Sequence, residues 1–133
     1  MPGGGTLGGG TLGGGTLGIV LASAEPGRVH AAFSMAAAGA AVGRRVLLLA
    51  TGSGVQALAA GAPFDPAFEA CLHTTGVATC AVLRDVLAEL DVLLMACDAA
   101  LRVENIPQLH PGVRVAGMAT FLAELGAASV ISF

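Results

Sequence analysis

The chain has 133 residues, of which 55% are hydrophobic and only 11% are charged, with a formal net charge of −3. All its basic residues are arginines and they are scattered, which argues against nucleic-acid binding and excludes a Schiff-base lysine or a P-loop lysine. So little charge at this length indicates that apolar surface is buried between subunits, and we expect a homo-oligomer.

The chain begins with a low-complexity repeat. Three copies of Gly-Gly-Gly-Thr-Leu occupy residues 3–17. Such a segment cannot bury a core, so we interpret residues 1–16 as a flexible leader to a single domain over residues 17–133. A phosphate-binding glycine loop is the alternative, but such a loop connects a strand to a helix, and this repeat precedes the first predicted strand.

The first half of the domain alternates apolar runs with helical patterns. Strands are predicted over residues 17–22 and 46–50, and the uninterrupted apolar character of the second is typical of a parallel strand covered on both faces. The Ala-rich segment over residues 28–42 predicts a helix with one apolar face. Two shorter helices are predicted over residues 55–60 and around residues 68–72.

The second half continues the same alternation. It is predicted to contain helices over residues 80–90, 99–104 and 118–125 and strands over residues 92–96, 113–115 and 129–133. Thr79 and Asp98 are the predicted N-caps of the first two helices, and Asn105 is expected to end the second in a left-handed conformation. In the helix over residues 80–90 we expect an apolar stripe, with Arg84 lying off it. The predicted stripe consists of Val82, Val86, Leu87 and Leu90.

This order of elements predicts an α/β protein. We expect three α/β/α layers, a mostly parallel five-stranded sheet and flavodoxin-like layering, with right-handed crossovers. In such sheets the site lies beyond the carboxyl ends of the strands, where four segments are predicted to meet. The candidate ligand-binding residues in these segments are Ser23, Thr51, Gly52, Ser53, Asp98 and Gly117.

Cys97 is the candidate catalytic residue. It is predicted to end a strand and to face the N-terminus of the next helix, where backbone N–H groups and the helix dipole stabilise a thiolate. The neighbouring carboxylate of Asp98 opposes this effect, and Arg102, one turn further on, is placed to offset it. A buried, inert cysteine is the alternative interpretation and is the commoner state of a free cysteine.

The other two cysteines, Cys71 and Cys80, do not suggest a metal site. Their spacing, with His73 between them, matches no common zinc pattern, and we expect neither a metal nor an organic cofactor. Either one remains a possible resolving thiol for Cys97. An odd number of cysteines argues against a disulfide framework, and no segment has the pattern of a signal peptide or a membrane-spanning helix. We therefore expect a cytoplasmic protein with no membrane span.

Three stretches together resemble the DsrE/DsrF-like family, and most closely its peroxiredoxin-like branch. The first is the Ala-rich segment over residues 31–43 that leads into Val46-Leu-Leu-Leu. The second is Met95-Ala-Cys-Asp98 with Ile106 following it, and the third is Val115-Ala-Gly-Met-Ala-Thr-Phe-Leu122 with Ser129-Val-Ile-Ser-Phe133. In the right order they cover most of residues 18–133.

The resemblance implies a DsrE-like fold, assembly into trimers or hexamers, and a function in sulfur relay. Family members of known role carry sulfur as a cysteine persulfide between donor and acceptor proteins, and their cysteine corresponds to Cys97. The chain departs from the family pattern at Asp98, where a Ser/Met-rich segment usually follows, and at Asn105, where Gly is usual.

Three functions remain open from the sequence. The first is a sulfur-relay protein that uses Cys97. The second is a non-catalytic oligomeric module that binds a small anionic ligand or a partner peptide in the strand-end crevice. The third is a redox pair between Cys97 and either Cys71 or Cys80.

Overall fold

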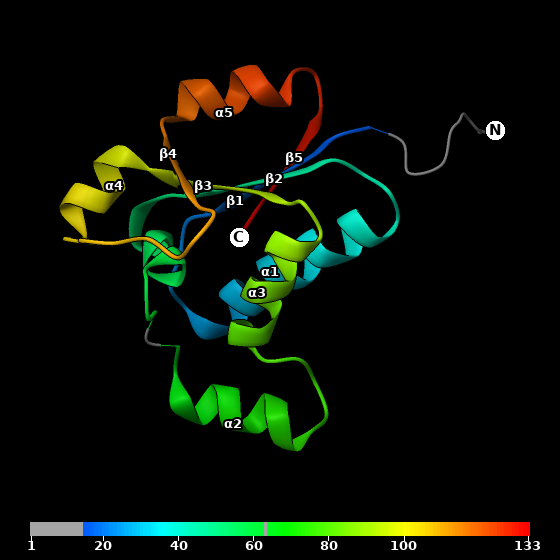
Figure 1. Ribbon diagram of the computed structural model, residues 1–133, viewed down its shortest axis with the longest axis vertical. Coiled ribbons are helices and arrows are strands. Elements are labelled where there is room, and N and C mark those ends of the chain that lie inside the picture. Colours follow the sequence, from blue (N-terminus) through cyan, green and yellow to red (C-terminus); the bar gives the residue numbers. More distant parts are fainter. Residues whose placement is uncertain (1–14, 63) are drawn as a thin grey trace.

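The protein is described by a computed structural model over residues 15–62 and 64–133 (Figure 1). Most of the predicted leader over residues 1–16 therefore lies outside the described residues. The described part contains a five-stranded sheet of order β4-β3-β2-β1-β5 in which every pair of neighbours is parallel. The strands are β1 (Leu17–Leu21), β2 (Val46–Ala50), β3 (Leu93–Cys97), β4 (Arg114–Ala116) and β5 (Ser129–Ser132).

Helices cover both faces of this sheet, which confirms the predicted three-layer α/β fold (Figure 1). They are α1 (Pro26–Ala41), the 3₁₀ helix η1 (Gly52–Leu58), α2 (Pro66–Thr74), α3 (Cys80–Glu89), α4 (Asp98–Val103) and α5 (Met118–Leu125). The larger apolar core lies between the sheet and α1, α3 and η1, and α5 forms a smaller core on the opposite face. Among the described helices, none is long and apolar enough to cross a membrane.

The strand β2 contributes side chains to both cores, and all five of its residues are buried. Alternation sends Leu48 toward the larger core and Leu47 and Leu49 toward α5. On the α5 side, Phe121 and Leu125 pack against Leu47 and Leu49. The uninterrupted apolar run that predicted a parallel strand is thus explained by helices on both faces.

The helix α1 begins two residues earlier than predicted. The carboxylate of Glu25 accepts hydrogen bonds from the N–H groups of Gly27 and Arg28, and Pro26 occupies the first turn, where no N–H is needed. Near its other end α1 lies close to the sheet, because a Cβ at Gly39 would lie 3.1 Å from side chains of both Leu17 and Val46. The Ala-rich sequence therefore permits tight packing on β1 and β2.

The helix predicted over residues 55–60 is present, but it begins three residues earlier and ends two residues earlier than predicted. The segment is the 3₁₀ helix η1, which begins at Gly52 directly after β2. Its start is pressed against β1, since a Cβ at Gly54 would lie only 2.2 Å from the carbonyl oxygen of Leu21. The next helix, α2, was predicted too short, because Asp65 caps it by accepting the Phe68 N–H and Pro66 opens its first turn.

The predicted apolar stripe of α3 is correct at Leu87, which is fully buried, but wrong at Val82 and in leaving out Arg84. Val82 is 52% exposed, whereas Arg84 is only 8% exposed and faces the core together with Cys80 and Leu87. The Arg84 guanidinium is tolerated there because it donates hydrogen bonds to the carbonyls of Ala57 and Ala59 at the end of η1. The predicted cap at Thr79 is confirmed, because its hydroxyl accepts the Val82 N–H at 3.2 Å.

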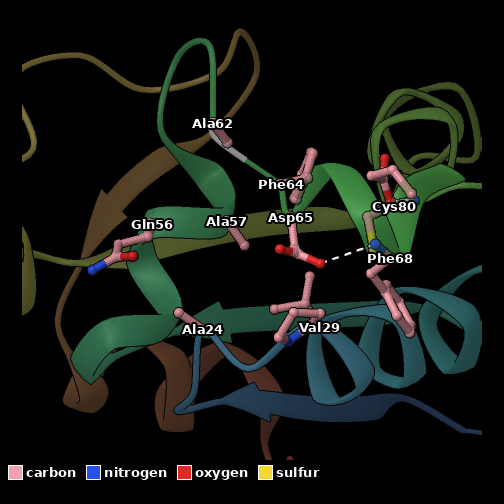
Figure 2. A pocket seen from close by; sticks show the side chains of 11 residues that line it. Ala24, Val29, Gln56, Ala57, Ala62, Phe64, Asp65, Phe68 and Cys80 are labelled. Carbon is pink, nitrogen blue, oxygen red and sulfur yellow. Dashed lines mark hydrogen bonds between the residues drawn. The ribbon is translucent and has the colours of Figure 1, made fainter.

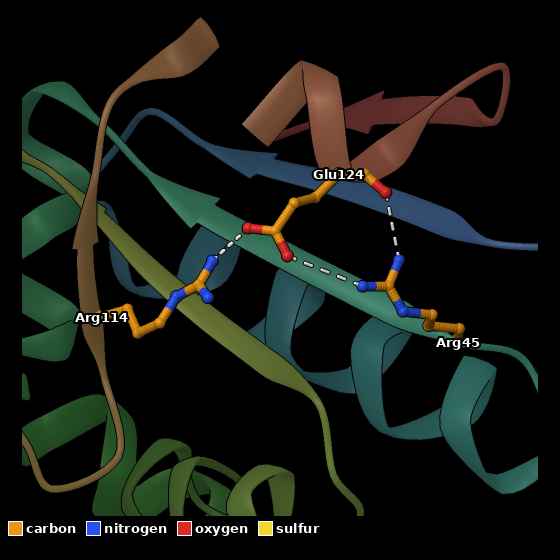
Figure 3. Close-up of polar contacts among 3 residues, drawn as sticks. All are labelled: Arg45, Arg114 and Glu124. Carbon is orange, nitrogen blue, oxygen red and sulfur yellow. Dashed lines mark hydrogen bonds and ion pairs between the residues drawn. The ribbon is translucent and has the colours of Figure 1, made fainter. Parts of the chain in front are cut away.

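The helix α5 is held to the sheet by an ion cluster centred on Glu124 (Figure 3). The Glu124 carboxylate accepts a hydrogen bond from Arg114 on β4 and pairs with Arg45, just before β2, at 3.8 Å. Arg45 also donates to the Glu124 backbone carbonyl at 3.2 Å. One side chain thus links α5 to two separate parts of the sheet.

Candidate functional site

The carboxyl ends of three neighbouring strands bring predicted site residues together. Ala50 pairs with Ala96, so Thr51, which follows β2, lies beside Cys97 at the end of β3. On its other side Cys97 pairs with Ala116, the last residue of β4. Asp98 and Gly117 follow at the ends of β3 and β4. These residues and Thr51 form a row of strand ends with Cys97 at its centre.

Cys97 also marks the point where the chain diverges to the two faces of the sheet. After β3 the chain enters α4, whose Ala100 belongs to the larger core, and after β4 it enters α5, which covers the opposite face. The side chain of Cys97 packs against both cores. In open parallel sheets, ligands bind in the crevice where adjacent connections separate in this way.

The Cys97 thiol is half-buried and free. Cys97 itself is the N-cap of α4, so the prediction that Asp98 caps this helix was wrong; Asp98 is its first residue. No side chain caps α4, because a thiol is a weak hydrogen-bond acceptor. Asp98 forms an ion pair with Arg102 one turn later, which confirms the predicted partner for its charge.

The two predicted serines brace the backbone near this row. The Ser23 hydroxyl accepts the Glu25 N–H at 3.0 Å, and the Ser53 hydroxyl accepts the Ala24 N–H at 3.2 Å. Ser53 therefore links the start of η1 to the turn after β1. Both hydroxyls have a structural contact already, and each retains capacity for a second hydrogen bond.

The remaining predicted ligand-binding residues shape the backbone. Gly52 has a φ of 52°, a left-handed conformation that favours glycine, and the Gly54 N–H donates to the Thr51 carbonyl at 2.9 Å. The Gly54 N–H is therefore not available to an anion. Gly117 is the exposed N-cap of α5, and nothing lies within 4 Å of the position of a Cβ there.

The three cysteines occupy different environments. Cys80 at the start of α3 is 2% exposed, and burial together with the nearby Glu69 carboxylate raises the pKa of its thiol to about 12. Cys71 is exposed on α2. Cys97 is thus the half-buried thiol at the strand ends. Within residues 15–62 and 64–133, no three His, Cys, Asp or Glu side chains lie close enough together to hold a metal ion.

A separate pocket was missed by the sequence analysis (Figure 2). It has a cavity volume of about 40 Å³ and lies among α1, η1, α2 and α3. None of the predicted site residues lines it. The signal that would have located its rim is Asp65-Pro66, since Asp followed by Pro is typical of an N-cap and first helical residue.

Comparison with known proteins does not extend these observations. No family model matches the chain, and no curated protein matches it.

Proposed function

We propose that the protein relays sulfur between partner proteins as a persulfide on Cys97. The observation that supports this most strongly is the position of Cys97 at the carboxyl end of β3, where the chain leaves β3 and β4 for opposite faces. A crevice at such a point is where α/β sheets usually bind their ligands. Cys97 is half-buried there, which gives a donor persulfide access and still shields the product from solvent.

The proposed chemistry has two balanced steps. The Cys97 thiolate attacks the outer sulfur of a donor persulfide, a new S–S bond forms at Cys97, and the donor leaves as its thiolate. An acceptor thiolate then attacks the outer sulfur of the Cys97 persulfide, which regenerates the Cys97 thiolate. Neither step needs an oxidant or a reductant, because one S–S bond replaces another.

The cysteine environments favour Cys97 over its two alternatives as the carrier. Cys80 is buried and its raised pKa keeps the thiol protonated, so it is a poor nucleophile. Cys71 is exposed on α2, away from the strand ends. The Asp98 carboxylate beside Cys97 forms an ion pair with Arg102.

Membership of the DsrE/DsrF-like family, a cytoplasmic location and a trimeric or hexameric assembly are parts of the same proposal. Three free cysteines suit a reducing compartment. Exposed apolar side chains on α5 and β5 suit an interface between copies of the chain, and they include Met118, Leu122 and Val130. Sedimentation analysis measures the assembly directly, and a monomer at micromolar concentration would contradict this part.

The sulfur-relay proposal is tested by intact mass measurement after incubation with a small-molecule persulfide donor. We expect the reduced protein to gain the mass of one sulfur atom and to lose it again when an acceptor thiol is added. Cys97→Ser should abolish the gain, because the attacking sulfur is removed.

Cys71→Ser is the matched control, since it removes an exposed thiol outside the strand-end row. It should load sulfur as the unmodified protein does. Sulfur carried equally by the Cys97→Ser variant would overturn the proposal.

A further inference from the structure

The strand β5 forms one edge of the sheet (Figure 1). It is the last strand in the order β4-β3-β2-β1-β5, and all four of its residues are exposed. We propose that this edge pairs in the antiparallel sense with β5 of a second copy of the chain, so that two sheets join across a two-fold axis. The inference rests on the homo-oligomer proposed above and names the contact that joins its copies.

The backbone of β5 directs hydrogen-bonding groups outward along this edge. The Phe133 N–H donates to the Val20 carbonyl at 2.8 Å, and the Phe133 carbonyl accepts the Ala22 N–H at 2.9 Å. Because such groups alternate in direction along a strand, Val130 and Ser132 direct their N–H and C=O groups away from β1. In the described part of the chain, β5 has a strand on one side only. A row of outward groups of this kind is a template for another strand.

The sequence of β5 lacks the features that usually keep edge strands apart. Proteins protect such edges with charged side chains, proline, bulges or very short strands. Residues 125–133 contain no charged residue and no proline, and the pairing of β5 with β1 is continuous. The side chains of Val130 and Ile131 are 44% and 37% exposed. The opposite edge is protected, because β4 has only three residues and one of them is Arg114.

A second copy is the occupant that this strand favours. In a two-fold contact the same strand faces itself, so a charged side chain would meet a like charge, which is unfavourable. The strand Ser129-Val-Ile-Ser132 has no charge to repel its copy. The chain as a whole has only 11% charged residues, which also indicates surface that is covered by other copies.

The direction of the outward groups decides the register of this pairing. Only a pairing of Val130 with Ser132 of the second copy lets both residues of each copy use their outward N–H and C=O groups. This register places Ile131 on the two-fold axis, opposite Ile131 of the second copy. The two Ile131 residues form a pair without hydrogen bonds, for which the Cα atoms lie about 4.5 Å apart.

A single cysteine on the two-fold axis tests the register. Ile131→Cys, made in a Cys71→Ser background and mildly oxidised, should form a dimer linked through the new thiols, because about 4.5 Å between Cα atoms suits a disulfide. Val130→Cys and Ser132→Cys are the matched controls, since each would lie about 8 Å from its own copy, which is too far. We expect at least about tenfold less linked dimer from either control. Equal linkage at all three positions, or none in Ile131→Cys, would overturn the proposal.

Ser132→Pro tests the edge hydrogen bonds themselves. Proline removes an N–H that points away from β1 and leaves the Phe133 hydrogen bonds to β1 in place. Sedimentation should show particles with half as many chains as those of the unmodified protein, because a two-fold contact joins equal halves. A variant that is folded by circular dichroism and keeps the full assembly would contradict the pairing, and if proline unfolds the chain the disulfide test decides.

Sulfur loading is measured on the same variants to separate the two proposals. Cys97 ends β3, which lies three strands away from β5 in the sheet order. Loss of the pairing with normal loading would overturn none of the chemistry proposed for Cys97. Failure of loading in a protein that still forms the Ile131→Cys disulfide would overturn the sulfur relay and support the pairing.

Discussion

The guanidinium carbon of Arg84 lies 4.8 Å from the centroid of the Phe64 ring, while its Nη1 donates to two carbonyls of η1. The side chain thus connects α3, η1 and the loop before α2 through one buried cation. Burial lowers its pKa, and the nearby carboxylates of Asp85 and Glu69 oppose that shift. We infer that Arg84 holds together α3, η1 and the loop before α2, which also line the pocket of Figure 2.

Arg84→Met should therefore destabilise the protein by about 3 kcal/mol, because it leaves the carbonyls of Ala57 and Ala59 without their donor. Methionine retains much of the side-chain volume, so the loss reports on hydrogen bonds more than on packing. Urea unfolding at fixed protein concentration measures it. Arg102→Met is the matched control and should cost less than about 1 kcal/mol, since the Arg102–Asp98 pair is exposed. Equal costs for the two variants would refute the role of Arg84.

Because the Cys80 thiol is buried, we predict that the free energy of unfolding falls steeply at alkaline pH. Its folded pKa of about 12 exceeds the ordinary value of 9.0, so the unfolded chain loses its proton first as the pH rises. The contribution of the protonated Cys80 thiol to the free energy of unfolding is complete below pH 9, and it falls by about 1.4 kcal/mol per pH unit between pH 9 and pH 12. The chain has no Lys and no Tyr to obscure this range.

Unfolding free energies at pH 8, pH 9, pH 10 and pH 11 test this pH dependence. Cys80→Ser keeps a hydroxyl donor for Glu69 but does not titrate, so its stability should fall much less steeply. Cys71→Ser, which removes an exposed thiol, should retain the steep fall. Identical slopes for all three proteins would show that the pKa of Cys80 is not raised in the folded protein.

Gly54→Ala should be among the most disruptive small substitutions in the chain. The added Cβ would lie 2.2 Å from the Leu21 carbonyl oxygen, so β1 or η1 must move. We expect a destabilisation of about 3 kcal/mol, the upper end of the range for overpacking. Gly117→Ala is the control, since its Cβ meets nothing within 4 Å, and it should cost less than about 1 kcal/mol. Thermal unfolding of both variants separates the two cases.

Glu124→Gln tests the ion cluster that holds α5. It should cost about 1 kcal/mol at low salt, because glutamine keeps a hydrogen-bond acceptor but loses the charge shared by Arg45 and Arg114. The cost should nearly vanish in 1 M salt, where charges are screened over about 3 Å. A cost that does not change with salt would show that packing, not charge, positions Glu124.

The fold was predictable because strand and helix patterns alternate clearly along the chain. The run over residues 46–50 has no polar interruption, and the helix predicted over residues 118–125 has the bounds of α5. Asn105 was also predicted correctly as left-handed, with a φ of 55°. These features depend on local sequence alone.

The errors arose where distant segments decide the outcome. Arg84 faces the core because carbonyls of η1, more than twenty residues away, accept its hydrogen bonds, and periodicity carries no sign of them. Position 54 has no room for a side chain because Leu21 of β1 lies against it, which the local sequence does not reveal. The pocket likewise needs four elements in place before its lining residues meet.

The row of strand ends was predicted, but the details around Cys97 were not. Parallel topology placed Thr51, Cys97 and Gly117 at one edge of the sheet, because all the strands run in one direction. The cap of α4 was assigned to Asp98, since Asp is a favoured N-cap residue. In the structure the β3 backbone continues one residue further, and Cys97 itself becomes the cap.

Cys97 is the proposed sulfur carrier, and tandem mass spectrometry of the loaded, unmodified protein locates the sulfur on a single cysteine. The protein is loaded with a persulfide donor, free thiols and persulfides are alkylated, and each cysteine-containing peptide is sequenced. We predict that the extra sulfur lies on Cys97 and leaves it when an acceptor thiol is added. Sulfur found on Cys71 or Cys80 with Cys97 unmodified would contradict it.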